Sequence, residues 1–322
     1  MHLPDGFLDA KTALLCAGAS TTGVGIALKQ VRTCLEPRQM PMLGLAAAFV
    51  FAAQMLNFPV AGGTSGHLVG GVLTAVLLGP SAAILVITCV LIVQCLMFAD
   101  GGLTALGANV LNMGIISVCG GYFVFRLVKS AIRMEETRAT VFAAAFASWF
   151  GTVLASIACA GELAFSKTVP WSVAFPPMAL VHMVIGIGEG LVTGLVVLAI
   201  MRRRPQMVAG VGESASGARL SLVAYGFLVA LALAVFVAPF ACPWPDGLEV
   251  VARSLGFQTK AAPAALGAPL ADYRLPWVGS ATLATAVAGA IGTVAAFVAA
   301  YVLARILVPG LGTSRKHVPS AD

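Results

Sequence analysis

Nine apolar stretches divide this chain of 322 residues, and they constrain its fold more than any other feature. Each is roughly 15 to 28 residues long, close to the ~20 apolar residues with which a helix crosses the hydrocarbon core of a bilayer. They cover residues 11–28, 41–58, 66–79, 81–98, 104–125, 139–161, 173–200, 219–241 and 281–304. The composition agrees, because 59% of the residues are hydrophobic and 10% are charged, whereas about a quarter are charged in a soluble domain. The sequence therefore predicts an all-α integral membrane protein with about nine transmembrane helices.

The third stretch, 66–79, is the shortest of the nine. It follows a Gly-rich segment and meets the fourth stretch at Gly79-Pro80, a dipeptide typical of a tight turn. A partly re-entrant helix is therefore the alternative to a full span at this position, and it would change the helix count by one.

Lysine and arginine residues gather in connections that share one side of the membrane. If the N-terminus lies outside, 14 of the 19 basic residues fall on the inner side, as the excess on cytoplasmic loops requires. The inner ones are Lys29, Arg32, Arg38, Arg126, Lys129, Arg133, Arg138, Arg202, Arg203, Arg204, Arg219, Arg305, Arg315 and Lys316. No basic stripe with interleaved aromatic residues is present, which argues against nucleic-acid binding despite a net charge of +6. We expect a multi-pass protein of the cell inner membrane, in contact with lipid.

The chain divides at about residue 205. The basic run Arg202-Arg203-Arg204-Pro205 precedes a polar stretch from Gly210 to Gly217 that is typical of a linker. We predict a seven-helix domain at 1–204, a linker at 205–218 and a two-helix domain at 219–322. The outer loop of the second domain carries the sequence PDGLE from Pro245 to Glu249.

The N-terminus offers three nitrogen ligands to one cation. The opening MHLPDGFLDAK lacks the basic region of a cleavable signal peptide, and His2 is too bulky for removal of the initiator methionine, so we expect a free α-amine on Met1. This amine, the His2 amide nitrogen and the His2 imidazole can close fused five- and six-membered chelate rings. Nitrogen-rich tetragonal sites suit Ni(II), Cu(II) and related ions. Binding should weaken at acid pH, because protons compete for the same nitrogens.

His67, in the Gly-rich segment that runs from Pro59, is a candidate for the fourth ligand. The predicted topology brings His67 to the same membrane face as the N-terminus. Glycines permit irregular backbone, which is tolerated at membrane depth where it is buried in protein or lines a cavity. A histidine that merely caps a helix start is the alternative.

Other polar residues occur inside the apolar stretches. Five amide side chains would either hold the His67 loop by hydrogen bonds or join helices to each other: Gln54, Asn57, Gln94, Asn109 and Asn112. His182 and Glu189 share one helix face, and an intramembrane carboxylate is a functional candidate, with a structural hydrogen bond as the alternative. Asp5, Asp100 and Asp246 each precede glycine, which is typical of turns; they would also raise the local cation concentration.

Four blocks of this sequence resemble the CbiM and NikM proteins, the metal-binding subunits of cobalt and nickel energy-coupling-factor transporters. The blocks are MHLPDGFL from Met1, QMLNFPVAGGTSGHL from Gln54, QCLMFADGG from Gln94 leading into GANVLNMG from Gly107, and HMVIGIGEG from His182. The last two apolar stretches, with PDGLE between them, resemble the NikN-type small membrane component. The whole chain is thus similar to a fusion of two components, and Leu3 stands where the family usually has isoleucine.

The resemblance implies a substrate-specific (S) component that captures Co²⁺ or Ni²⁺ at the outer membrane face. It implies metal ligation by the Met1 amine, the His2 amide and imidazole nitrogens, and the His67 imidazole. It also implies two kinds of partner, a transmembrane coupling subunit of the CbiQ or NikQ type and cytoplasmic ATPases of the CbiO or NikO type. The chain itself has no P-loop motif, and the metal is its transported ligand rather than a cofactor. The choice between cobalt and nickel stays open, because the same nitrogen ligands serve both.

Two other classes of function are alternatives. A self-sufficient, ion-coupled metal permease would use Glu189 for proton exchange and would transport metal without ATP. A membrane metallohydrolase would hold zinc beside an open coordination position, but the chain has no HExxH or GxSxG motif. We therefore expect that the protein is not an enzyme.

Overall fold

A computed structural model describes residues 1–203 and 216–307 of the chain, and nearly all of its regular structure is helical. The longer helices are α1 (Ala10–Cys34), α2 (Met40–Gln54), α4 (Pro80–Val93), α6 (Ser117–Ala131), α7 (Glu136–Phe165), α8 (Trp171–Arg203), α9 (Ser216–Ala232) and α11 (Ala281–Leu307). Three short helices are α3 (Gly71–Leu78), α5 (Leu106–Asn109) and α10 (Gly247–Ser254). Wider π-helical turns extend the longer ones at η2 (Gln94–Phe98), η3 (Val110–Ile116) and η5 (Leu233–Val237). Most of the predicted linker falls on 204–215, outside the described residues.

The prediction of an all-α membrane protein is confirmed, apart from one small hairpin. Strands β1 (Phe58–Val60) and β2 (Thr64–Gly66) pair antiparallel just before His67. Within the described residues, seven helices are long and apolar enough to cross a membrane, and α2 is a shorter apolar helix of 15 residues. All nine predicted stretches carry helix, so about nine membrane helices is a fair description.

The stretch 66–79 is not a full span, however. Its helix α3 has 8 residues, which rise only about 12 Å. Two glycines with left-handed backbone limit it, because Gly70 at φ 75° begins the helix and Gly79 at φ 85° ends it. The segment 66–79 therefore contains a short helix in place of a full-length membrane helix.

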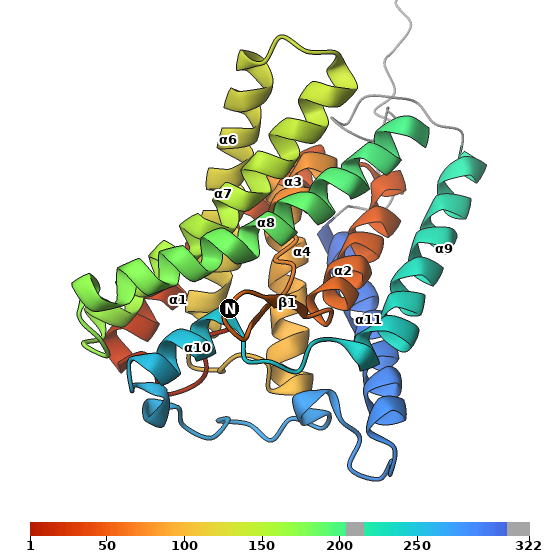
Figure 1. Cartoon of the computed structure of the whole chain (residues 1–322). Helices are drawn as coiled ribbons and strands as arrows, with labels where there is room; N and C mark the ends of the chain where they lie inside the picture. The colour runs from red at the N-terminus through yellow and green to blue at the C-terminus, as the bar shows by residue number, and fades with distance from the viewer. Residues whose placement is uncertain (204–215, 308–322) are drawn as a thin grey trace, which may run out of the picture.

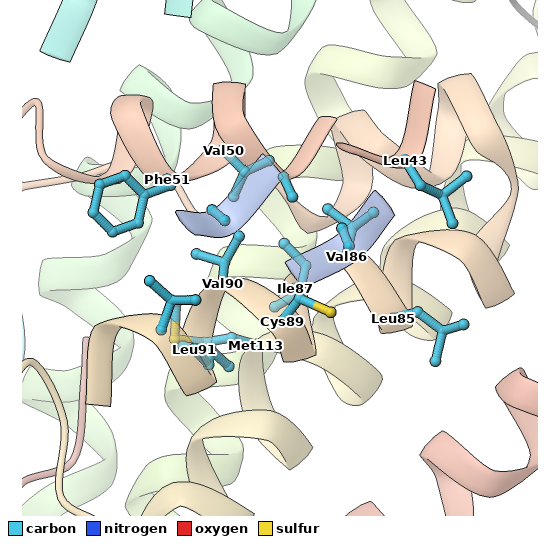
Figure 2. Packing of buried hydrophobic residues seen from close by; sticks show 14 of the residues in the cluster. Leu43, Val50, Phe51, Leu85, Val86, Ile87, Cys89, Val90, Leu91 and Met113 are labelled. Atoms are coloured by element: carbon cyan, nitrogen blue, oxygen red, sulfur yellow. The ribbon is translucent and has the colours of Figure 1, made fainter. Parts of the chain in front are cut away.

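Helix α4 forms the centre of the bundle, where it is buried for most of its length. Figure 2 shows how side chains of α2, α4 and η3 meet there, with Val50 and Phe51 on α2 close to Val90 on α4. The last helix, α11, packs against α2 through small residues, and a Cβ added at Gly292 would lie 2.0 Å from the Phe51 ring. Such close contact is how membrane helices associate. The two C-terminal membrane helices thus pack on the bundle formed by the others.

The N-terminus lies inside the molecule, between β1 and α10 (Figure 1). The first helix begins only at residue 10, where the Asp9 side chain accepts a hydrogen bond from the Thr12 amide. Residues 1–4 have no regular structure and residues 5–8 form a turn and a bend, with Met1, Leu3, Asp5 and Phe7 buried. Gly6, at φ 90°, lies so close to the backbone of the loop at 260–262 that a Cβ there would be 2.3 Å from the Lys260 carbonyl.

Candidate metal centre

The α-amine of Met1 meets the side chain of His67, which lies 66 residues later in the chain. The amine nitrogen is 2.5 Å from His67 Nε2 and 2.9 Å from Asp246 Oδ2. Met1 is only 6% exposed and His67 8%. Burying a charged amine costs free energy unless it is paired, and here His67 and Asp246 are its partners.

The imidazole of His2 lies against that of His67. The two rings stack with their centres 5.2 Å apart and their planes at 21°. Nδ1 of His2 is 3.1 Å from Asp100 Oδ1, while its Nε2 is buried and has no hydrogen-bond partner. Burial lowers the pKa of His2 below its usual value, which favours the neutral form that metals bind.

The loop of His67 is arranged so that Nε2 faces the amine. His67 Nδ1 lies 3.1 Å from the Leu68 carbonyl oxygen. A carbonyl can only accept, so Nδ1 carries the proton and Nε2 keeps its lone pair. The Gln54 side chain donates to the Val69 carbonyl at 2.9 Å, which ties the loop to α2.

Hydrogen bonds on both edges hold the N-terminal segment. The Asn109 side chain accepts from the Leu3 amide at 2.8 Å and donates to the Leu3 carbonyl at 3.1 Å. Asp5 accepts from the Thr104 amide and hydroxyl at 2.8 and 2.6 Å, and from the Ala265 amide at 3.0 Å. Met1 and His2 are therefore fixed by residues from both the first and the last part of the chain.

The second half of the chain contributes an acidic residue to the centre. Asp246 begins α10, where its Oδ1 accepts from the Glu249 amide at 2.8 Å, and its Oδ2 pairs with the Met1 amine. Burial alone would raise the pKa of this carboxyl, but the Met1 ammonium and the His67 side chain hold it well below its usual range. Tyr273 donates to Asp100 Oδ2 at 2.6 Å and so supports the partner of His2.

The other candidates from the sequence divide into two groups. Gln54 and Asn109 hold the two ligand segments. Asn57 lines a cavity beside the two histidines, and Gln94 lies 3.5 Å through Nε2 from the Tyr273 hydroxyl. Asn112 points elsewhere, because it donates to Glu162 at 2.7 Å. His182 is buried. Its Nδ1 lies 2.8 Å from the carbonyl oxygen of Met178, which is one turn earlier in α8.

A cavity of about 720 Å³ reaches the centre. Its walls include both histidines together with Asp100, Asp246 and Tyr273. Among residues 1–203 and 216–307, no group of three or more His, Cys, Asp or Glu side chains is placed to hold a metal ion. The Met1 amine, which lies beside His67 Nε2, adds a nitrogen that could bind a metal ion in this cavity.

Known proteins resemble this chain in sequence and, over part of its length, in fold. A family model described as the cobalt uptake substrate-specific transmembrane region, CbiM, matches residues 2–207. The chain belongs to the CbiM family. A second model, the PDGLE domain, matches residues 220–308 of this CbiM-family chain. The protein is thus a multi-pass membrane component of cobalt or nickel transport.

Relatives of the CbiM-family chain include fused and single-component proteins. A putative fused nickel transport protein NikMN of Archaeoglobus fulgidus is 37% identical over 307 residues, which cover 95% of this chain and 98% of the relative. A putative cobalt transport protein CbiM of Methanococcus voltae is 31% identical over 214 residues, 64% of this chain and 94% of the relative. A crystal structure of a truncated transition metal transporter, 33% identical, matches with a TM-score of 0.57 over 63% of this chain and 99% of its own.

Proposed function

We propose that this protein captures Ni²⁺ or Co²⁺ at the outer membrane face, for ATP-driven uptake by partner subunits. The ligands are the Met1 amine, the His2 amide and imidazole nitrogens, and the Nε2 of His67. The observation that carries the proposal is the 2.5 Å separation of the Met1 nitrogen and His67 Nε2. Two nitrogens bound to one ion at about 2.0–2.1 Å and at right angles would be ~2.9 Å apart. The two nitrogens would therefore have to move only slightly apart to bind one ion.

The His2 ring has to turn over for the full chelate. A six-membered ring closes through Nδ1, and in the structure Nδ1 faces Asp100. Rotation about the Cβ–Cγ bond would bring Nδ1 toward the ion and Nε2 to the Asp100 side. The carboxylate would then accept from Nε2–H, as carboxylates commonly do behind a metal-bound histidine.

Membership of the CbiM family supports our proposal for the rest of the assembly. We divide the chain into a metal-capture domain at 1–204, a linker at 205–218 and a domain with two membrane helices at 219–322. The basic loops then lie on the cytoplasmic side of the inner membrane, and the metal centre lies outside. A CbiQ- or NikQ-like coupling subunit and CbiO- or NikO-like ATPases would supply the energy for uptake.

The alternative of an ion-coupled permease relies on Glu189, which has two backbone partners in the structure. Glu189 accepts hydrogen bonds from the Val69 amide at 2.6 Å and the Gly70 amide at 3.0 Å. Both of its oxygens are therefore occupied by backbone in the part of the chain that the structure describes. A group that serves as a fixed acceptor is poorly suited to exchange protons with each transport cycle.

Metal uptake into sealed vesicles tests the proposal. We expect the purified chain alone, reconstituted in proteoliposomes, to bind Ni²⁺ or Co²⁺ but to accumulate neither, with or without a proton gradient. With a coupling subunit and ATPases from a related transporter, and with ATP inside the vesicles, accumulation should appear. Uptake by the chain alone that follows the proton gradient would support the permease instead.

A further inference from the structure

Glu189 is a carboxylate buried in the middle of a membrane helix. It lies on α8, is 1% exposed, and is 120 residues away in sequence from the amide that it binds at Val69. Burying such a group in a membrane is costly, so a carboxylate at this depth is expected to have a specific partner. Its partners are the two consecutive amides of Val69 and Gly70, which directly follow His67 and Leu68.

These two amides cannot be satisfied by the chain around them. Gly70 has left-handed backbone at φ 75° and begins helix α3, and the first amides of a helix have no partner within it. Glu189 Oε2 and Oε1 take one amide each, at 2.6 and 3.0 Å. The carboxylate thereby fixes the backbone at the point where the irregular loop of His67 becomes a helix.

Another residue of α8 supports the same loop from its other end. Ile185, one turn before Glu189, packs so tightly against Gly66 that a Cβ there would lie 2.7 Å from its Cγ2. Gly66 directly precedes His67. The loop is therefore held on both sides of His67 by one face of α8, through packing at Gly66 and through hydrogen bonds at Val69 and Gly70.

We propose that Glu189 is the positioning residue of the metal centre, which sets the place of His67 by binding the backbone behind it. The inference rests on the proposed function, because it requires His67 to be a ligand. Glutamine has a similar shape but presents an NH₂ group in place of one oxygen. That group cannot accept from a backbone amide, so Glu189→Gln would release one of the two amides.

Glu162→Gln provides a matched control. Glu162 is also a buried carboxylate on a membrane helix, with an exposure of 7%, and it accepts from Asn112 at 2.7 Å and from Cys16 at 3.4 Å. None of these residues lies in the His67 loop. Nickel affinity of the full-length protein in detergent should fall about 10- to 100-fold in Glu189→Gln, the usual effect of losing a group that orients a ligand, and should stay within about threefold in Glu162→Gln.

A double-mutant cycle separates positioning from general damage. If Glu189 acts through His67, Glu189→Gln should have no further effect on the weaker nickel binding of His67→Ala. Additive losses in the double variant would overturn the inference, as would equal losses in Glu189→Gln and Glu162→Gln or unchanged binding in Glu189→Gln. If instead the unaltered protein binds no nickel or cobalt, it is the proposed function that fails.

Discussion

Adding two residues before Met1 should lower nickel affinity by at least about 1000-fold, or ~4 kcal/mol. The extension turns the α-amine of Met1 into an amide and removes the donor that lies 2.5 Å from His67 Nε2. There is also little room for two more residues next to the Met1 nitrogen, because Met1 is 6% exposed and this nitrogen pairs with Asp246. Isothermal titration calorimetry of the purified protein measures the change.

Two added residues are better than one for this test. A single residue would place the histidine third from a new amine, where another chelate can form. The same two residues added at the C-terminus are the control, and they should leave nickel binding unchanged. Tight binding that survives the N-terminal extension would exclude the amine as a ligand, and Asp100 and Asp246 would become the donors to examine.

His67→Ala should weaken nickel binding by about 100- to 1000-fold, or ~3–4 kcal/mol, and should also change the absorption spectrum of the complex. The N-terminal chelate would keep three nitrogens, and water would take the fourth position, so the ligand field around the metal would be weaker. Titration followed by visible absorption records both effects. A spectrum identical to that of the unaltered protein would mean that His67 does not touch the metal.

His182→Ala is the matched control for that change. His182 is also buried, at 2% exposure, and it lines a small pocket with Met1 and His67. Its Nδ1 is bound to the Met178 carbonyl, and it is not one of the proposed ligands. Its loss should leave the spectrum unchanged. A large spectral effect in His182→Ala together with none in His67→Ala would mean that His182, and not His67, is the ligand.

Much of the fold and the meeting of His2 with His67 could be predicted from the sequence. Long apolar stretches predict membrane helices, because a helix pairs its backbone N–H and C=O groups internally and lipid offers them no other partners. The side of the membrane then follows from the basic residues, and it predicts that the N-terminus and the Gly-rich loop share one face. The structure confirms the proximity, with the His2 and His67 ring centres 5.2 Å apart.

The contacts made by the second half of the chain were not predictable in the same way. Asp246 begins α10, as a turn-forming aspartate next to glycine should, but its second oxygen reaches Met1 only because the loop folds back over the N-terminus. Tyr273 likewise reaches Asp100 from a loop that hydropathy leaves without structure. Such contacts depend on tertiary packing, and a local pattern carries no trace of them.

The short helix α3 and the role of Glu189 show a second limit. Hydropathy detects that 66–79 is apolar, but the length of its helix depends on where two glycines turn the backbone. The sequence identifies Glu189 as unusual for a membrane helix, yet the partner is a pair of backbone amides, which every residue except proline possesses. The sequence shows that a carboxylate lies within a membrane helix, but only the fold shows that it binds the amides of Val69 and Gly70.

The number of protons released when nickel binds tests the chelate most directly. Titration calorimetry at neutral pH, in several buffers with different ionisation enthalpies, gives this number. The proposed ligand set predicts about two protons for each metal ion, one from the Met1 ammonium and one from the His2 amide, because both nitrogens must lose a proton to bind. Release of about one proton or none would contradict it, since at least one of these two nitrogens would then not be a ligand.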